Sequence, residues 1–251
     1  MKVCGVQKIL HFVRYWTSFV PGGQALARMV LDWMAARQNK KSRALLQARG
    51  FEICSKIHKV LTAAGVRYFA DHGTLLGLIR ENGMIAHDTD MDFSIPPDQP
   101  IQAVYTVLST NGFSLVHGFA IHGEVQEITV AYGGITIDFF KCHSIGDDLG
   151  HYVFCPQYDM KRGVLTGVMA HERKRPPLKG LEVREFGTHM KARISIPTNA
   201  IEYLTASYGN WQVPDSTTDF CSDKIPTQFR DIVEGCEMLN PGEVLQAFKQ
   251  A

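Results

Sequence analysis

The sequence lacks the cysteine patterns that mark redox motifs and zinc fingers. Its six cysteines include no C-x-x-C pair, and a chain of 251 residues is long enough to form a core without disulfide staples. We therefore expect reduced thiols in a cytoplasmic protein. The spacing C-H-x7-H-x3-C of Cys142, His143, His151 and Cys155 fits no common zinc pattern. These four residues are expected in the core and in loops.

Long apolar runs and repeats are also absent. No uncharged stretch approaches the roughly 20 residues that an α-helix needs to cross a bilayer, so no membrane-spanning helix is expected. The chain contains no internal repeat and no low-complexity segment. With 45% hydrophobic and 20% charged residues, it has the composition of an ordinary globular protein.

Acidic residues are nearly absent from the first fifty positions. Residues 1–50 contain nine Lys or Arg against Asp32 alone, whereas the rest of the chain contains 17 against 24 Asp or Glu. Apolar residues, Trp33 among them, recur there at helical spacing. Two interpretations stay open: helices that bind an anionic membrane surface, or helices that pack on the body with solvated cations. We divide the chain into a basic helical appendage, residues 1–50, and a main domain, residues 51–251.

Periodicity predicts the elements of the main domain. Ile53, Ile57 and Leu61 lie on one face of a helix that Gly65 can end. The other expected elements are a strand at 66–70, a short helix at about 74–80, a helix at 101–112, a strand at 113–117, a basic loop at 171–180 and a helix at 198–208. The tail from 214 onward shows no clear pattern.

Negative charge is concentrated in the segment IAHDTDMDFSI, residues 85–95. In a strand, Asp88, Asp90 and Asp92 would share one face, with Met91 and Phe93 on the other. Two unit charges about 4 Å apart repel by about 4 kcal/mol at an effective dielectric of 20, so a cation is the natural counterpart. Carboxylates without Cys or His at ligand spacing suit a hard ion, Mg²⁺ or Mn²⁺.

The D-x-D-x-D pattern also allows two other interpretations. An EF-hand loop counted from Asp88 would need glycine where Phe93 stands and glutamate where Gln99 stands, which excludes a calcium loop of that type. The second alternative is a solvated surface strand with no ligand.

A fourth carboxylate argues against the solvated strand. Residues 124–140, EVQEITVAYGGITIDFF, predict a hairpin that turns at Gly133 and Gly134. Asp138 lies in its second strand among apolar residues, and burial of a carboxylate there is costly unless it is paired or coordinated. Acidic residues on two neighbouring strands indicate a site.

A glycine turn precedes the acidic strand. Gly73 and Thr74 lie between a strand and a short helix, where backbone N–H groups and a hydroxyl can hold a phosphate. His72 is next to them and either contacts that phosphate or has a structural role. A phosphate cradle, two metal-binding aspartates and a third carboxylate together describe a nucleotidyltransferase-like active site.

Three segments resemble, in order, the motifs of the LicD/fukutin family. GTLLGLIRENGMIAHDTDMDFSI (73–95) looks like that family's G-T-L-L-G-x-x-R, glycine, W-D-D-D-x-D motif. ITIDFF (135–140) is similar to its hydrophobic-D-hydrophobic-F strand, and IPTNAIEYLTASYGNWQVP (196–214) to its closing block. His87 and Thr89 replace the usual tryptophan and aspartate. These departures leave the D-x-D pair intact and bear on the identity of the donor or acceptor.

The resemblance implies an α/β nucleotidyltransferase-like fold of the polymerase-beta type, a mixed sheet flanked by helices, as the catalytic domain over residues 51–251. It implies a metal-dependent transferase that moves a phosphorylated alcohol, such as phosphocholine or a polyol phosphate, from a CDP-activated donor to a sugar hydroxyl and releases CMP. The acceptor would be a surface glycan or its lipid-linked precursor, at the cytoplasmic face of a membrane. Transfer of NMP, a metal-dependent glycosyltransferase and a scaffold with a relict site remain alternatives. No nucleic-acid partner is expected, because the body is acidic.

The resemblance also assigns roles to individual residues. Asp90 and Asp92 would bind Mg²⁺ or Mn²⁺, and Asp138 would be a third ligand or the base for the acceptor hydroxyl. The residues expected to bind substrate are Gly73 and Thr74 at the donor diphosphate, Arg80 as its counter-charge, and His72 and Asp88. Lys174, Arg175, Lys179, Lys191 and Arg193 either bind phosphate or form a solvated basic face.

Overall fold

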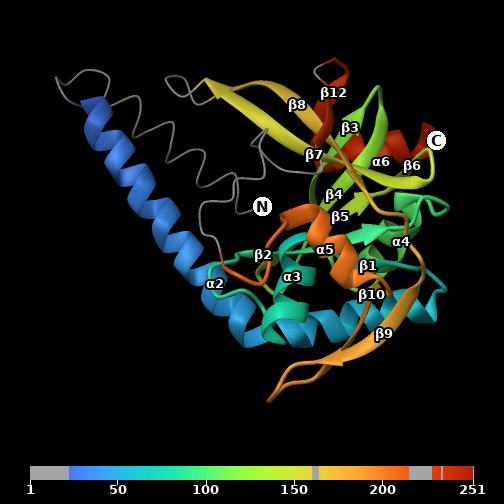
Figure 1. Ribbon diagram of the computed structural model, residues 1–251. Coiled ribbons are helices and arrows are strands. Elements are labelled where there is room, and N and C mark those ends of the chain that lie inside the picture. The colour runs from blue at the N-terminus through green and yellow to red at the C-terminus, as the bar shows by residue number, and fades with distance from the viewer. Residues whose placement is uncertain (1–22, 160–163, 215–227, 233, 251) are drawn as a thin grey trace. The chain divides into compact units, whose positions relative to one another are not determined.

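A computed structural model describes residues 23–159, 164–214, 228–232 and 234–250 (Figure 1). The chain forms two compact units, Met1–Ala44 and Leu45–Ala251. The first part of the predicted appendage, residues 1–22, lies outside the described residues.

The first described element is one continuous helix, α2 (Gly23–Ala63), of 41 residues. The sequence predicted separate helices before and after residue 50. They are continuous because residues 24–49 contain no glycine or proline and are rich in helix formers. Gly50 continues the helix and lets Met84 approach, since a Cβ there would lie 3.0 Å from Met84 Cγ. The predicted end is confirmed, because the chain leaves the helix before Gly65, which has a φ of 69°.

The main sheet has six strands in the order β1-β2-β5-β4-β3-β12. Strands β2 and β5 are parallel, and the other neighbours are antiparallel. The strands are β1 (Phe69–Ala70), β2 (Asp90–Ile95), β3 (Ser114–Ile121), β4 (Glu124–Tyr132), β5 (Ile135–Lys141) and β12 (Cys236–Leu239). The accompanying helices are α3 (His72–Glu81), α4 (Ile101–Thr110), α5 (Ala200–Tyr208) and α6 (Pro241–Gln250). The predicted mixed α/β class is confirmed.

The alternation predicted for β2 divides the sheet into an apolar and a polar face. Met91, Phe93 and Ile95 are fully buried. Cys54 of α2 lies against this face, with its Sγ 3.6 Å from Met91 Sδ. The aspartates of β2 therefore point to the opposite face of the sheet.

The predicted hairpin is also confirmed. Tyr132 pairs with Ile135, and Gly133 and Gly134 take φ values of 61° and 89°. Both values fall in the left-handed region that a two-residue hairpin turn of this type requires. The turn fixes the register of β5 against β4.

A second sheet has the order β11-β8-β7-β6. Its strands are β6 (His143–Ile145), β7 (Asp148–Asp159), β8 (Val164–Arg175) and β11 (Gln228–Ile232), and a separate hairpin consists of β9 (Leu181–Phe186) and β10 (Ala192–Pro197). Strands β7 and β8 form the long hairpin drawn in yellow in Figure 1. The predicted basic loop is wrong over its first half, because residues 171–175 form the end of β8 and His171, Arg173 and Arg175 are buried.

The expectation of reduced thiols is wrong at one position. Cys155 is disulfide-bonded, whereas Cys54, Cys142 and Cys236 have free thiols. The disulfide also removes Cys155 as a ligand from the zinc set considered above. No helix of the described ranges combines the length and apolarity needed to span a membrane.

Candidate active site

Carboxylates from both parallel strands line one pocket of about 340 Å³. Its lining consists of His72, Gly73, Asp88, Asp90, Asp92, Glu127, Asp138, Phe140, Val153 and Phe154. Six of the eight residues predicted from the sequence are therefore brought together. The other two, Thr74 and Arg80, are not part of the lining.

The centre of the site is the pairing of β2 with β5. Asp92 is the direct cross-strand partner of Asp138 in this parallel register, and Asp90 lies opposite Thr136. Since side chains alternate along a strand, Asp90, Asp92 and Asp138 share one face of the sheet. The predicted convergence of acidic side chains from two adjacent strands is present.

Burial and mutual repulsion raise the pKa values of these carboxyl groups. Burial, followed by the charges of Asp90 and Asp138, holds the pKa of Asp92 well above its ordinary value. Burial raises the pKa of Asp138 to about 7, although a hydrogen bond from Thr129 opposes the shift. Burial likewise raises the pKa of Asp88 to about 6. Without a cation the cluster therefore retains protons, and a bound cation would favour its fully ionised form.

The donor set fits a hard divalent ion in chemistry but does not form a finished metal site. All five acidic side chains of the pocket offer oxygen ligands, which Mg²⁺ and Mn²⁺ prefer. Within the described ranges, however, no group of three or more His, Cys, Asp or Glu side chains lies close enough together to hold a metal ion. Metal binding would require these carboxylates to move closer.

The start of α3 approaches the carboxylates closely. Asp71 caps this helix and accepts a hydrogen bond from the backbone N of His72 at 2.7 Å. A Cβ on Gly73 would lie 2.8 Å from Asp88 Oδ2 and 3.5 Å from Asp92 Oδ2. Only glycine leaves room for this close approach. Because the first residues of α3 line the pocket, the positive end of the helix dipole faces the carboxylates.

Thr74 and Arg80 have other partners in this structure. The Thr74 hydroxyl is buried and accepts a hydrogen bond from the Asp92 backbone N at 2.8 Å, which joins α3 to β2. Arg80 lies in the last turn of α3, forms an ion pair with Glu81 at 2.6 Å and donates to the Trp211 carbonyl at 3.3 Å. In this structure both residues therefore attach α3 to neighbouring segments of the chain, and neither lines the pocket.

Sequence reasoning missed several lining residues. Glu127 of β4 is buried in the pocket wall, and burial followed by the charge of Asp138 holds its pKa well above its ordinary value. Thr129 pairs with Asp138 across the hairpin and donates a hydrogen bond to its Oδ1. The signal was available, because the Gly133-Gly134 turn fixes which β4 residues lie opposite β5. Val153 and Phe154 come from the second sheet, whose position no sequence pattern predicted.

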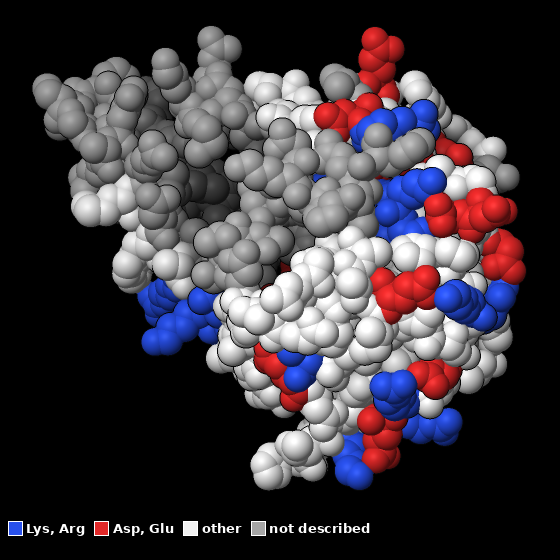
Figure 2. Space-filling model, viewed as in Figure 1, with Lys and Arg blue, Asp and Glu red and all other residues white. Residues whose placement is uncertain are grey.

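The basic residues considered as phosphate ligands mostly have acidic partners. Lys174 pairs with Asp148 at 2.9 Å, and Arg175 is buried against Asp71. Two further ion pairs are Lys179–Glu202 at 2.7 Å and Lys191–Glu185 at 2.8 Å. In Figure 2, cationic and anionic side chains are interspersed over the part of the surface that is coloured. The paired, solvated interpretation fits the three lysines better than a phosphate-binding face, whereas Arg175 is buried and forms part of neither.

Comparisons with known proteins agree with the position of this site. Residues 65–173 match the family model described as LicD/FKTN/FKRP, nucleotidyltransferase domain. An uncharacterized protein of Rickettsia typhi, RT0683, is 26% identical over 106 residues, which cover 41% of this chain and 32% of that protein. This chain thus spans about a third of that relative's length. The third motif, residues 196–214, lies outside the family match. The matched residues include every carboxylate of the pocket, so the candidate site lies within the part of the chain that is similar to the LicD family.

Proposed function

We propose that the protein is a metal-dependent LicD-type transferase with a nucleotidyltransferase-like fold. It moves a phosphorylated alcohol, phosphocholine or a polyol phosphate, from a CDP-activated donor to a sugar hydroxyl and releases CMP. One observation carries this proposal. Asp92 and Asp138 are partners across parallel strands, in a pocket that also contains the glycine start of α3, within the family match.

Asp90, Asp92 and Asp138 are the proposed ligands of Mg²⁺ or Mn²⁺. Burial is the main cause of their raised pKa values, and the charges of neighbouring carboxylates add to it at Asp92 and Asp138. A divalent ion bound there would neutralise the donor diphosphate and stabilise the departing CMP.

The chain's own residues supply positioning and proton transfer. Asp138 is the third ligand or the base for the acceptor hydroxyl. Thr129 donates to its Oδ1, which orients the carboxylate and leaves Oδ2 to face the substrate. The backbone at Gly73 offers the N-terminus of α3 to a phosphate, with His72 and Asp88 beside it. Thr74 holds α3 against β2, and Arg80 is the proposed counter-charge of the donor.

We also propose that the appendage contacts a membrane surface that carries a lipid-linked glycan acceptor. On α2, Met29 and Trp33 are four residues apart and 63% and 60% exposed. The Arg37 guanidinium lies 5.5 Å from the Trp33 ring centre. The exposed Lys40, Lys41 and Arg43 follow in the next turns. Apolar anchors followed by cations suit anionic headgroups.

The proposed location is the cytoplasmic face of the membrane, with no nucleic-acid partner. The free thiols agree with this location, whereas a disulfide at Cys155 is atypical there. Cell fractionation with thiol labelling of Cys155 tests the proposal. A protein recovered from an oxidising compartment would contradict it.

The activity test uses the full chain with Mg²⁺ and CDP-choline, CDP-glycerol, CDP-ribitol or CDP-ethanolamine. Thermal stabilisation by one donor, and CMP release when a glycan acceptor is added, support the proposal. Pyrophosphate release from NTPs would instead indicate NMP transfer. Release of UDP or GDP from sugar nucleotides would indicate a glycosyltransferase. A protein that binds no nucleotide in the presence of metal would contradict all three activities and favour a scaffold.

A further inference from the structure

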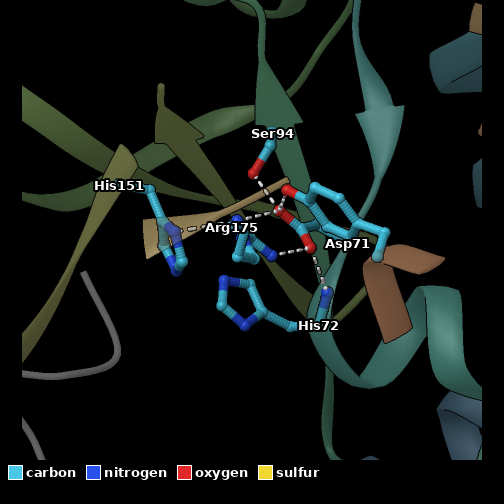
Figure 3. A network of polar contacts seen from close by, with 6 residues as sticks. Asp71, His72, Ser94, His151 and Arg175 are labelled. Carbon is cyan, nitrogen blue, oxygen red and sulfur yellow. Dashed lines mark hydrogen bonds and ion pairs between the residues drawn. The ribbon is translucent and has the colours of Figure 1, made fainter. Parts of the chain in front are cut away.

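A buried network of polar contacts is centred on Asp71, next to the pocket residue His72 (Figure 3). Asp71 is 1% exposed and does not line the pocket. Its carboxylate accepts hydrogen bonds from the His72 backbone, the Ser94 hydroxyl, the Tyr203 hydroxyl and the Arg175 guanidinium. These partners come from α3, β2, α5 and β8, so one carboxylate joins four elements.

Arg175 is the charged partner of Asp71. Its two terminal nitrogens donate to the two oxygens of Asp71 at 2.7 and 2.9 Å, a bidentate arrangement. Burial alone would raise the pKa of Asp71, but the charges of Arg175 and His72, together with the hydrogen bonds from Arg175 and Ser94, outweigh burial and lower that pKa to about 2. Both partners are therefore ionised, and the pair links the end of β8 to the start of α3.

Arg175 also fixes the protonation of a histidine beside the pocket. It donates to His151 Nδ1 at 2.8 Å. Because a guanidinium can only donate, His151 Nδ1 is an acceptor and the ring proton is on Nε2. The His151 ring lies 4.8 Å, centre to centre, from the ring of His72, which lines the pocket.

The network holds an unfavourable backbone conformation at the edge of the pocket. His72 has a φ of 44°, in the left-handed region that side chains other than glycine rarely occupy. Its backbone N is held by Asp71, and its ring packs against those of Phe140, at 4.7 Å, and His151. The conformation of His72 sets the direction in which the backbone continues through Gly73 into α3.

The same network connects the helix start to the acidic strand. The backbone N of Asp71 donates to the Asp92 carbonyl at 3.0 Å. The Ser94 hydroxyl, two residues further along β2, donates to the Asp71 carboxylate. The position of Gly73 relative to Asp92 therefore depends on Asp71 and, through it, on Arg175.

We propose that Asp71 and Arg175 are a positioning pair for the pocket: they hold His72 and Gly73 at the start of α3 in register with Asp92. Neither residue touches the substrate. The part of this proposal that concerns ligand binding rests on the proposed function. The part that concerns the local conformation of α3 does not.

The test removes both charges together. Breaking one partner leaves a buried unpaired charge and endangers folding, whereas replacing both with uncharged residues of similar size retains the fold more often. The variant is Asp71→Asn with Arg175→Met. The matched control is Glu172→Gln with Arg230→Gln, which removes a second carboxylate–arginine pair on β8 and β11. Glu172 is 1% exposed and is not part of the pocket lining.

Two measurements are made on folded protein with a melting temperature near that of the wild type. Calorimetry gives the Kd for Mn²⁺ and for CDP-choline with Mn²⁺, and hydrogen exchange follows the backbone amides of residues 72–76. We expect at least a tenfold weaker Kd and faster exchange in the Asp71/Arg175 variant, with neither change in the control. A third variant, Asp71→Asn with Arg175→Met and His72→Gly, should recover part of the protection, because glycine adopts the left-handed conformation without strain.

The outcomes separate the two proposals. If the wild type binds neither Mn²⁺ nor the nucleotide, the proposed function fails, and hydrogen exchange alone decides the positioning role. Unchanged exchange at residues 72–76 in the Asp71/Arg175 variant overturns the positioning pair. If that double variant does not fold, Arg175→Lys replaces it. Loss of the bidentate geometry should then give faster exchange, and wild-type exchange would overturn the proposal.

Discussion

Asp92 and Asp138 are direct partners across two parallel strands, with side chains on the same face of the sheet. A sheet that places two carboxylates side by side loses stability through repulsion unless a ligand compensates it. Asp92 is on β2, and Asp138 is on β5, the second strand of a hairpin. The register of β2 against β5 places the two residues opposite each other. The proposed chemistry depends on this pair.

Replacing either of the two carboxylates of β2 should abolish transfer and leave the fold intact. Asp90→Asn and Asp92→Asn each remove a proposed metal ligand and also relieve repulsion within the cluster. We expect CMP release to fall at least about 100-fold, since replacing a residue that only hydrogen-bonds to a metal's ligand already lowers metal affinity or activity by about 10–100-fold. The melting temperature should stay the same or rise. The matched control is Asp98→Asn, because Asp98 is exposed and pairs with Arg67. Near-normal activity of Asp92→Asn would refute the assignment.

A methyl group at Gly73 should block the pocket. The Cβ of Gly73→Ala would lie 2.8 Å from Asp88 Oδ2, so the helix start or the carboxylate must move. We expect donor affinity, measured by calorimetry, to fall about tenfold or more, in line with the cost of a small misplacement. Gly167→Ala is the control, because a Cβ there meets nothing within 4 Å. Equal donor affinity in the two variants would show that the α3 start does not hold the phosphate.

Without divalent ions, the protein should lose stability between pH 6.5 and 8.5. The pKa of Asp138 is raised to about 7, and the pKa values of Asp92 and Glu127 are raised well above their ordinary ranges. At pH 6.5 the folded state therefore binds protons that the unfolded chain has already released, and stability falls as pH rises. The lowered pKa values of His72, about 4, and His151 act in the opposite direction, but only below about pH 6.5.

Melting curves at pH 6.5, 7.5 and 8.5 measure this loss, at about 2–4 °C for each kcal/mol in a chain of this size. Mg²⁺ should restore the melting temperature at pH 8.5 and have little effect at pH 6.5. Asp138→Asn should reduce the fall. A melting temperature that rises over this range would contradict the raised pKa values.

The appendage should bind anionic membranes through one face of α2. Trp33→Ser with Met29→Ser removes the exposed apolar anchors, and Lys40→Glu with Lys41→Glu reverses the cations. Each double variant should co-sediment at least several-fold less with vesicles that contain phosphatidylserine, because apolar burial and electrostatic attraction both contribute. Lys59→Glu is the control, an exposed cation of α2 within the main unit. If the wild type does not sediment with these vesicles, the helix is a packing or linking element instead.

The parts of the fold governed by local chemistry were predictable. Alternation along β2 and the Gly133-Gly134 turn predicted both acidic strands. The turn also sets the pairing of β4 with β5, from which Thr129 could have been predicted to lie opposite Asp138. The end of α5 at Gly209 was likewise predicted from the sequence.

Long-range packing was not predictable from the same patterns. The segment containing Arg173 and Arg175 looked like a basic loop, because only tertiary contacts, such as that with Asp71, make burial of an arginine favourable. The tail contains β11, β12 and α6. Of these, β11 and β12 add edge strands to two sheets formed by distant parts of the chain. The role of Asp71 was also hidden, since Ser94, Arg175 and Tyr203, three of its four partners, lie far from it in the sequence.

Direct titration of Mn²⁺ into the wild type, Asp92→Asn and Asp138→Asn by calorimetry tests the central claim most directly. The account predicts saturable binding by the wild type and at least tenfold weaker binding by each variant, with Asp98→Asn unchanged. Wild-type affinity in both Asp92→Asn and Asp138→Asn, or no Mn²⁺ binding by the wild type at all, would contradict it.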